Sequence, residues 1–301
     1  MGNWKEVLDE AKQAGSTHDL IRKKYLKRLQ QHTKRNVIAY YSGWLQKPHL
    51  GPVPIFSIGD ADMTGFMASI HRMKADRGLD LLLHTPGGSL AATEALVTYL
   101  RAKFGADVRV IVPQLAMSAG SMISLASREI VMGKHSSLGP IDPQVNGVPA
   151  HGIVEEFETA IAEASKNPAR APFWGAIIGK YNPTLIGECK KAIEWSEQLV
   201  TDWLTSGMLA GEEDRAALAA VIVKELGDHA LTKTHGRHYS LAQVQQLGIK
   251  VKPLEDDDRL QELVLSYHHA TIQTFAATNA VKIIENHRGI SYIEQVLVQA
   301  K

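Results

Sequence analysis

In Leu81-Leu82-Leu83-His84-Thr85-Pro86-Gly87-Gly88-Ser89, a run of apolar residues ends at a Pro-Gly turn. The same pattern recurs in Val108-Arg109-Val110-Ile111-Val112-Pro113, which leads into Ala116-Met117-Ser118-Ala119-Gly120-Ser121. Each segment is typical of a buried strand that ends at a turn and passes into a helix. Two such units in tandem predict an α/β fold with parallel strands and helical crossovers. Because ligands collect at the carboxyl ends of parallel strands, we expect the chemistry at these two turns.

The composition of the 301-residue chain excludes several classes of protein. A net charge of +1, with 22% charged residues, gives no general reason to expect nucleic-acid binding. No apolar run is long enough to span a bilayer, and Met1–Glu6 lacks the layout of a secretion signal, so a cytoplasmic location is expected. Cys189 is the single cysteine, which excludes an internal disulfide and a cysteine metal cluster. No G-x-G-x-x-G follows a strand and there is no P-loop, so no cofactor is expected.

Further elements extend outward from the two turns. We expect strands at 37–41, 55–58 and 129–132, and helices at 4–35, 90–104, 152–165, 184–209, 216–226 and 260–279. Asp60 or Asp62 is a candidate cap for the helix that follows it, and the acidic run 255–258 is a candidate cap for the last long helix. The basic face of the first helix is interpreted as solvated. The pattern divides the chain into an N-terminal helical extension (1–36), a catalytic domain (37–252) and a C-terminal helical extension (253–301).

Ser118 is the candidate nucleophile, because a serine at a strand-to-helix elbow exposes its Oγ. The alternative is that Ser118 only caps the helix that follows. The amides of Gly88 and Ala119 are placed to stabilise a developing oxyanion, although a Gly-Gly pair is also typical of a tight turn. Ser121 and Ser124 compete as nucleophiles but lie inside the helix.

A serine nucleophile also needs a base. Asp142 is the acidic residue of the Gly139–Pro143 loop, and Lys180 and Lys191 are candidate lysine bases if a desolvated pocket lowers their pKa. For each lysine taken alone, the favoured interpretation is a solvated surface residue. His229, His235 and His238 match no specific metal-ligand pattern, so no metal site is expected and they are interpreted as polar loop residues.

The linked set Thr85–Gly88, Ala116–Ser121 and Ser136–Gln144 resembles the serine dehydrogenase proteinase family, related to signal peptide peptidase A and to the Clp protease subunit. The resemblance spans about residues 37–250. It implies a Clp/crotonase-like ββα spiral, with Ser118 as nucleophile and the Gly88 and Ala119 amides as oxyanion hole. Residues expected to border the substrate are Gly87, Ser89, Gly120, Pro140 and Asp142.

The same resemblance bears on the base and on the activity. Clp proteases carry a histidine in the segment matching Leu138–Pro143, where this chain has Asp142, so that triad is not supported. Signal peptide peptidase A uses a lysine, which favours Lys180 or Lys191. The resemblance implies an ATP-independent serine endopeptidase that acts on polypeptides as a homo-oligomer without a cofactor. The alternatives are an inactive scaffold or regulatory subunit, and a crotonase-type acyl-thioester enzyme, for which Glu94 is the nearest carboxylate to the first turn.

Overall fold

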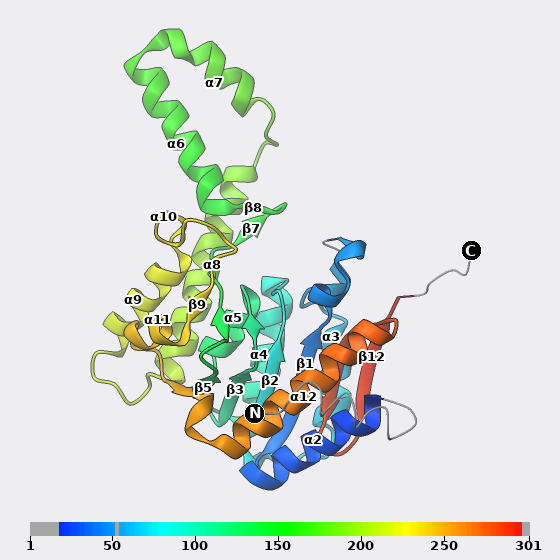
Figure 1. The fold of residues 1–301 in the computed structure, drawn as a ribbon. Coiled ribbons are helices and arrows are strands. Elements are labelled where there is room, and N and C mark those ends of the chain that lie inside the picture. The colour runs from blue at the N-terminus through cyan, green and yellow to red at the C-terminus, as the bar shows by residue number, and fades with distance from the viewer. Residues whose placement is uncertain (1–17, 52–53, 297–301) are drawn as a thin grey trace, which may run out of the picture.

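The computed structural model describes residues 18–51 and 54–296, which fold around a seven-stranded sheet (Figure 1). The strand order is β10-β5-β3-β2-β1-β11-β12. The strands are β1 (Asn36–Ser42), β2 (Leu79–His84), β3 (Val108–Val112), β5 (Glu129–Met132), β10 (Val251–Pro253), β11 (Ala280–Asn286) and β12 (Ser291–Gln295). The first five run parallel, and β11 and β12 add an antiparallel edge. The result is a mixed α/β fold with a mostly parallel central sheet.

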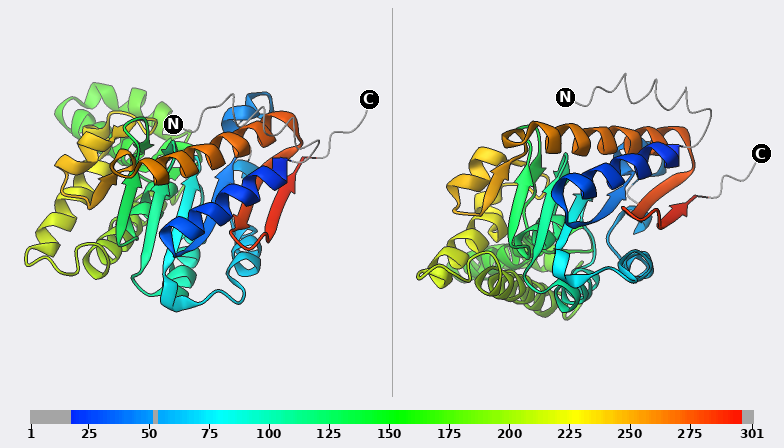
Figure 2. Two further views of the ribbon diagram at one scale, coloured as in Figure 1. Left: turned by 60° about the horizontal axis from the view of Figure 1, so that its bottom comes forward. Right: turned by 90° about the horizontal axis from the view of Figure 1, so that it is seen from below.

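Helices cover both faces of this sheet, because its central strands are apolar on both sides. Val37, Ala39 and Tyr41 of β1 belong to one buried cluster, with α2 (His18–Thr33) and α12 (Asp258–Ala277), whereas Ile38 and Tyr40 belong to the other. Figure 2 shows α2 and α12 side by side on one face. On the opposite face lie α4 (Leu90–Phe104), α5 (Ala119–Leu125), α8 (Leu185–Ser206), α9 (Arg215–Gly227) and α11 (Leu241–Gln246).

A second, three-stranded sheet joins segments that are distant in sequence. It consists of β4 (Leu115–Ala116), β6 (Ser137–Leu138) and β9 (Tyr239–Ser240), with β4 parallel to β6 and β6 antiparallel to β9. Further short elements are α3 (Asp62–Ile70), the hairpin β7 (Gln144–Val145) and β8 (Val148–Pro149), and α10 (His229–Thr232). This small sheet ties the segment just before Ser118, through β6, to β9 in the C-terminal third of the chain.

An arm projects from the body at the top of Figure 1. It consists of α6 (Ala150–Lys166), a short 3-10 turn and α7 (Ala171–Ile178), and returns to the body through α8. Its base encloses a small apolar cluster separate from the two sheet clusters, built on Ala150, Ile153, Leu185 and Cys189. On the arm, Ile161 and Phe173 leave most of their apolar side chains exposed. The arm is therefore an appendage with its own small core.

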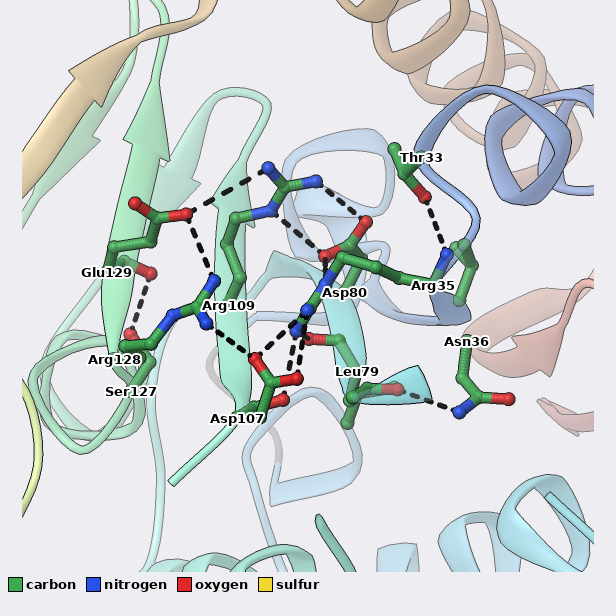
Figure 3. Close-up of polar contacts among 12 residues, drawn as sticks. Thr33, Arg35, Asn36, Leu79, Asp80, Asp107, Arg109, Ser127, Arg128 and Glu129 are labelled. Carbon is green, nitrogen blue, oxygen red and sulfur yellow. Dashed lines mark hydrogen bonds and ion pairs between the residues drawn. The ribbon is translucent and has the colours of Figure 1, made fainter. Parts of the chain in front are cut away.

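The opposite end of the sheet carries a network of ion pairs (Figure 3). Asp80 is fully buried and accepts hydrogen bonds from Arg35 Nε at 2.7 Å and from Arg109 Nη2 at 2.8 Å. Arg35 also contacts Asp107, which is 39% exposed at its side chain. These bonds connect β1, β2 and β3 at their N-terminal ends. The network lies away from the turns that follow these strands. We therefore interpret it as a contribution to the stability of the fold.

Most of the expected central elements are confirmed, and several peripheral ones differ. Helix 90–104 and strand 129–132 have the predicted bounds, and Asp257 caps α12 through the Leu260 amide at 2.9 Å. The strand expected at 55–58 is wrong: a 3-10 turn occupies Pro54–Phe56, and Ile58 makes one isolated bridge to Gly88. Neither Asp60 nor Asp62 caps α3 through its side chain, because its N-cap is Ala61.

The two ends of the chain also differ from expectation. Residues 4–17 of the first expected helix lie outside the described residues. Within α2, Arg22 is fully buried and bonded to Glu285 at 2.8 Å, so this part of the basic face is not solvated. The C-terminal segment is only partly helical, since β11 and β12 complete the central sheet. No helix within the described residues is long and apolar enough to cross a membrane.

Candidate active site

Ser118 lies at a sharp turn between β4 and α5. Its backbone angles, φ 50° and ψ −117°, are rare for a residue with a side chain and cost about 1–3 kcal/mol. Ser118 is the N-cap position of α5 but makes no side-chain cap hydrogen bond. The capping alternative for this serine is therefore not supported. The strained turn presents the side chain at the carboxyl end of the sheet, as the elbow geometry requires.

The Gly87-Gly88 turn packs directly against this elbow. A Cβ on Gly87 would lie 2.6 Å from Ser118 Cβ and 3.1 Å from the Ala119 nitrogen, and Gly87 has φ +105°. A Cβ on Gly88 would lie 2.3 Å from the backbone of Ile58. Only glycine permits this approach, because any larger residue would collide with the elbow or with Ile58. The two turns identified in the sequence therefore meet at one place.

Two backbone amides at this meeting point have no hydrogen-bond partner among the described residues. The turn is fixed by hydrogen bonds from Ile58 N to Gly87 O (2.7 Å) and from Ser89 N to Ile58 O (2.9 Å), which leave the Gly88 amide free. The Ala119 amide is the first of α5 and is also free. Free amides beside a serine hydroxyl are suited to bind an oxygen that becomes negative.

Ser118 opens into a cavity of about 420 Å³. Its wall includes Pro86, Gly87, Gly88 and Ser89 of the first turn, Ser118, Ala119 and Met122 of the second, Ile141–Gln144 of the loop after β6, Ala192, Trp195 and Ser196 of α8, and His235. Next to it lies a larger apolar groove of about 740 Å³, lined in part by Trp44, Phe56 and Ile58. The two share Ser57, Pro86, Gly88 and Ser89. The cavity and the groove therefore form one continuous hollow beside Ser118.

Asp142 and His235 form a hydrogen-bonded pair in the wall of this cavity. His235 Nδ1 lies 2.8 Å from Asp142 Oδ1, and the Asp142 side chain is fully buried whereas that of His235 is 23% exposed. Asp142 Oδ2 is buried without a hydrogen-bond partner among the described residues. Ser196 Oγ donates to Ile141 O at 3.1 Å, and Ile141 N donates to Leu226 O, which fixes the backbone beside Asp142.

The small sheet explains why these two residues meet. Leu138 of β6 faces Tyr239 of β9 in antiparallel register. Asp142 lies four residues after Leu138, and His235 lies four residues before Tyr239, so both lie at the same distance beyond the last pair. No local sequence pattern predicts this pairing, because Asp142 and His235 lie in different loops.

The other predicted site residues divide among the cavity wall, the buried interior and the exposed surface. Gly87, Ser89 and Asp142 line the cavity with Ser118, Gly88 and Ala119, whereas Gly120 and Pro140 are buried outside its wall. Lys180 and Lys191 are exposed, and neither lines the cavity. Glu94, the carboxylate considered for an acyl-thioester enzyme, also lies outside it.

The competing serines have structural roles. Ser121 is fully buried, and its Oγ accepts from Gly139 N at 2.8 Å and lies 2.8 Å from Ala116 O. Ser124 is also fully buried and donates to Gly120 O at 2.8 Å. Both hydroxyls hold the start of α5 in place and neither faces the cavity.

A buried lysine supports the turn from behind. Lys282 of β11 is 3% exposed at its side chain and donates to Ser57 O at 2.9 Å and to Asp62 Oδ1 at 2.7 Å. Asp62 Oδ2 in turn accepts from Gly59 N at 3.0 Å and from the Tyr40 hydroxyl at 2.8 Å. These contacts bracket Ile58, which holds Gly88 in place. The missed strand β11 therefore supplies part of the support for the candidate oxyanion hole.

Comparison with known proteins is consistent with this geometry. The model of a family described as ClpP-like SDH-type serine proteinase matches residues 11–285. Two uncharacterized proteins of Methanocaldococcus jannaschii are similar to the chain: MJ1495 is 32% identical and MJ0137 29% identical, each over 200 residues and 66% of this chain. The chain spans 61% and 62% of the length of these relatives.

Proposed function

Because the chain belongs to the ClpP-like SDH-type serine proteinase family, we propose that it hydrolyses peptide bonds with Ser118 as the nucleophile. The family supports peptidase activity in general. The observation that carries the assignment to Ser118 is its strained elbow at the wall of the cavity, beside two free amides. In this proposal the Gly88 and Ala119 amides bind the oxyanion, and loss of one such donor typically costs about 3–4 kcal/mol of barrier lowering.

The proposal includes three finer expectations. The ββα-spiral arrangement is supported by the small sheet that closes over the elbow. A homo-oligomer is supported by the exposed apolar residues of the arm, Ile161 and Phe173. A polypeptide substrate is supported by the groove that continues from the cavity. A cytoplasmic location and the absence of nucleic-acid partners stay predictions from composition.

The Ser–Lys mechanism expected from the resemblance has less support. A lysine accepts a proton near neutral pH only when burial or a neighbouring cation lowers its pKa. Lys180 and Lys191 are exposed, and neither is among the residues of the cavity wall that Ser118 faces. Substitution of each lysine by alanine tests whether it takes part.

Labelling with a fluorophosphonate probe, read by intact mass and peptide mapping, tests the assignment of the nucleophile. One adduct on the wild type that disappears in Ser118→Ala is the expected result. Ser206→Ala is a matched control, because Ser206 is exposed and lies outside the cavity. An adduct that persists in Ser118→Ala contradicts the assignment of the nucleophile to Ser118. No adduct on folded wild type contradicts the proposed activity and favours a scaffold.

A further inference from the structure

We propose that the tip of the arm binds the surface of an anionic lipid bilayer, with Phe173 entering the headgroup region. We define the tip as residues 166–180, which contain α7 and the turns on each side of it. The inference goes beyond the proposed function, because no residue of the tip lines the Ser118 cavity. Three observations carry it: an apolar helix without a buried side chain, cations on both sides of that helix, and carboxylates kept away from it.

Helix α7 is apolar but contributes no side chain to a buried core. None of its eight residues is charged, and none is buried. It packs on α6 and on the 3-10 turn Pro168–Arg170, both of which belong to the arm. Figure 1 shows it at the end of the arm that is far from the sheet. The side chain of Phe173 is 63% exposed. An apolar helix whose side chains are left in water marks a surface that a partner covers.

The aromatic side chains of the tip are held in place by the arm itself. The rings of Phe173 and Trp174 meet edge to face, with their centroids 5.8 Å apart. Trp174 Nε1 donates to Glu163 Oε2 at 2.9 Å, so its polar group already has a partner. The Tyr181 hydroxyl donates to Glu156, which fixes the segment after α7 against α6. Aromatic residues are enriched where proteins meet the membrane–water interface, so this edge of the tip is suited to a bilayer surface.

The charged side chains of the tip are all positive. Between Glu163 and Glu188 the sequence has the cations Lys166, Arg170 and Lys180, and it has no carboxylate. All three cations are exposed. Arg170 pairs with Glu163 at 2.6 Å, whereas neither lysine forms an ion pair with any residue that the structure describes. Each lysine or arginine near an anionic bilayer strengthens binding by about fivefold, so these cations favour such a surface.

The carboxylates of α6 lie nearer the base of the arm. Glu155, Glu156 and Glu158 all precede the last two turns of this helix. At 1.5 Å per residue, Glu158 is about 12 Å along the helix axis from Lys166, which exceeds the screening length of about 8 Å at physiological ionic strength. Glu163 is closer, but Arg170 pairs with it. Repulsion between these carboxylates and an anionic surface at the tip is therefore weak.

The same charges favour a bilayer over the other partners that could cover an apolar helix. A two-fold contact between the tips of two copies would bring Lys166, Arg170 and Lys180 against the same cations of the second copy, and like charges repel. A nucleic acid offers negative charge but no apolar layer for Phe173. An anionic bilayer offers both, and α7 is too short to cross it, so the tip lies in the interface.

The test uses the full chain and vesicles of phosphatidylcholine, with or without about 30 mol% phosphatidylserine. Because Cys189 is the single cysteine of the sequence and is buried, a Phe173→Cys variant is labelled selectively with an environment-sensitive fluorophore. Val221→Cys is the matched control, since Val221 is 52% exposed but lies on α9 in the body. We expect phosphatidylserine vesicles to shift the emission of the Phe173→Cys probe to the blue and to leave the control spectrum unchanged.

Sedimentation of the unlabelled protein with these vesicles measures the size of the effect. Phe173→Ala is expected to weaken binding about 10-fold, and Lys166→Gln and Lys180→Gln about 5-fold each. Lys134→Gln, which changes an exposed lysine of the body, is expected to keep the wild-type affinity. All four variants should react with the fluorophosphonate at Ser118 at the wild-type rate, so a failure of binding is distinguished from a failure of the proposed function.

Three results would overturn the inference. The first is that folded wild type does not bind phosphatidylserine vesicles. The second is that it binds them with an affinity that the substitutions at the tip leave unchanged. The third is self-association without vesicles that Phe173→Ala abolishes, which would assign the tip to a contact between copies of the chain.

Discussion

Acid is expected to destabilise this protein through a histidine at the end of β2, just before the Gly87-Gly88 turn. His84, the last residue of β2, is fully buried, and burial lowers the pKa of its imidazole to about 3. Its Nδ1 accepts from Leu115 N at 3.4 Å, and its ring lies 4.4 Å from that of Trp44. Burial and neighbouring histidines also lower the pKa of His268, whose ring is 5.3 Å away. Both side chains are therefore neutral in the folded state.

The sign and size of the effect follow from proton binding. Because the pKa of His84 is lower in the folded state than its ordinary value of 6.5, the unfolded state binds more protons as the pH falls. The stability contributed by the neutral His84 side chain is therefore present above about pH 6.5, and it declines as the pH falls toward 3. For His84 alone the loss between pH 7 and pH 5 is about 2 kcal/mol, since one pKa unit is about 1.4 kcal/mol. His268 changes stability in the same direction.

Urea unfolding of wild type and His84→Asn between pH 7 and pH 5 checks this magnitude. Asparagine keeps an acceptor for the Leu115 amide but does not titrate, so the variant is expected to lose about 2 kcal/mol less than wild type over this range. The variant is also a control for carboxylates, which titrate in both proteins. Identical pH slopes for the two proteins would refute the reasoning.

Three further predictions concern the ion pairs and the glycine turn. In urea titrations, Asp80→Asn is expected to lower the free energy of unfolding by about 3 kcal/mol, because Asp80 is fully buried. Asp107→Asn is expected to lower it by less than about 1 kcal/mol, because Asp107 is more exposed. Equal effects of the two substitutions would contradict the role assigned to burial. Gly87→Ala is expected to fold but to slow labelling of Ser118 by about 100-fold or more, because its Cβ displaces the elbow; an unchanged labelling rate excludes this steric effect. Lys282→Met is expected to lower the free energy of unfolding in urea by about 3 kcal/mol and also to slow labelling of Ser118. A loss of stability with an unchanged labelling rate would show that Lys282 stabilises the fold but does not support the candidate oxyanion hole.

The central sheet and one half of the candidate active site were predictable because their signals are local. The apolar runs of β2 and β3 end at Pro and Gly, and each is followed by a helical pattern, so strands, turns and helices agree within a few residues. Ser118, Gly88 and Ala119 lie on those turns. The physical reason is that a strand-to-helix elbow is specified by adjacent residues.

The other half depends on contacts between distant segments. In β11, Lys282 and Glu285 interrupt the apolar pattern, and both are buried because Asp62 and Arg22 pair with them from across the chain. No local pattern predicts such partners, so the strand was missed. His235 was set aside for the same reason, since its partner Asp142 lies in another loop. The lysine hypotheses assumed a desolvated side chain, and desolvation depends on packing that a sequence motif does not describe.

The separate apolar cluster of the arm has a consequence for local unfolding of the protein. Its apolar cluster, with Ile153 and Cys189, shares no member with the two clusters that hold the sheet. The free energy that keeps the arm folded is therefore largely independent of the free energy that keeps the sheet folded. Between Asp142 and His235 the chain thus contains a segment able to unfold by itself, while the β6–β9 register still holds the two ends together. Backbone amides of α6 and α7 should exchange with solvent through this partial opening long before those of β1 and β2, which exchange only when the whole domain unfolds.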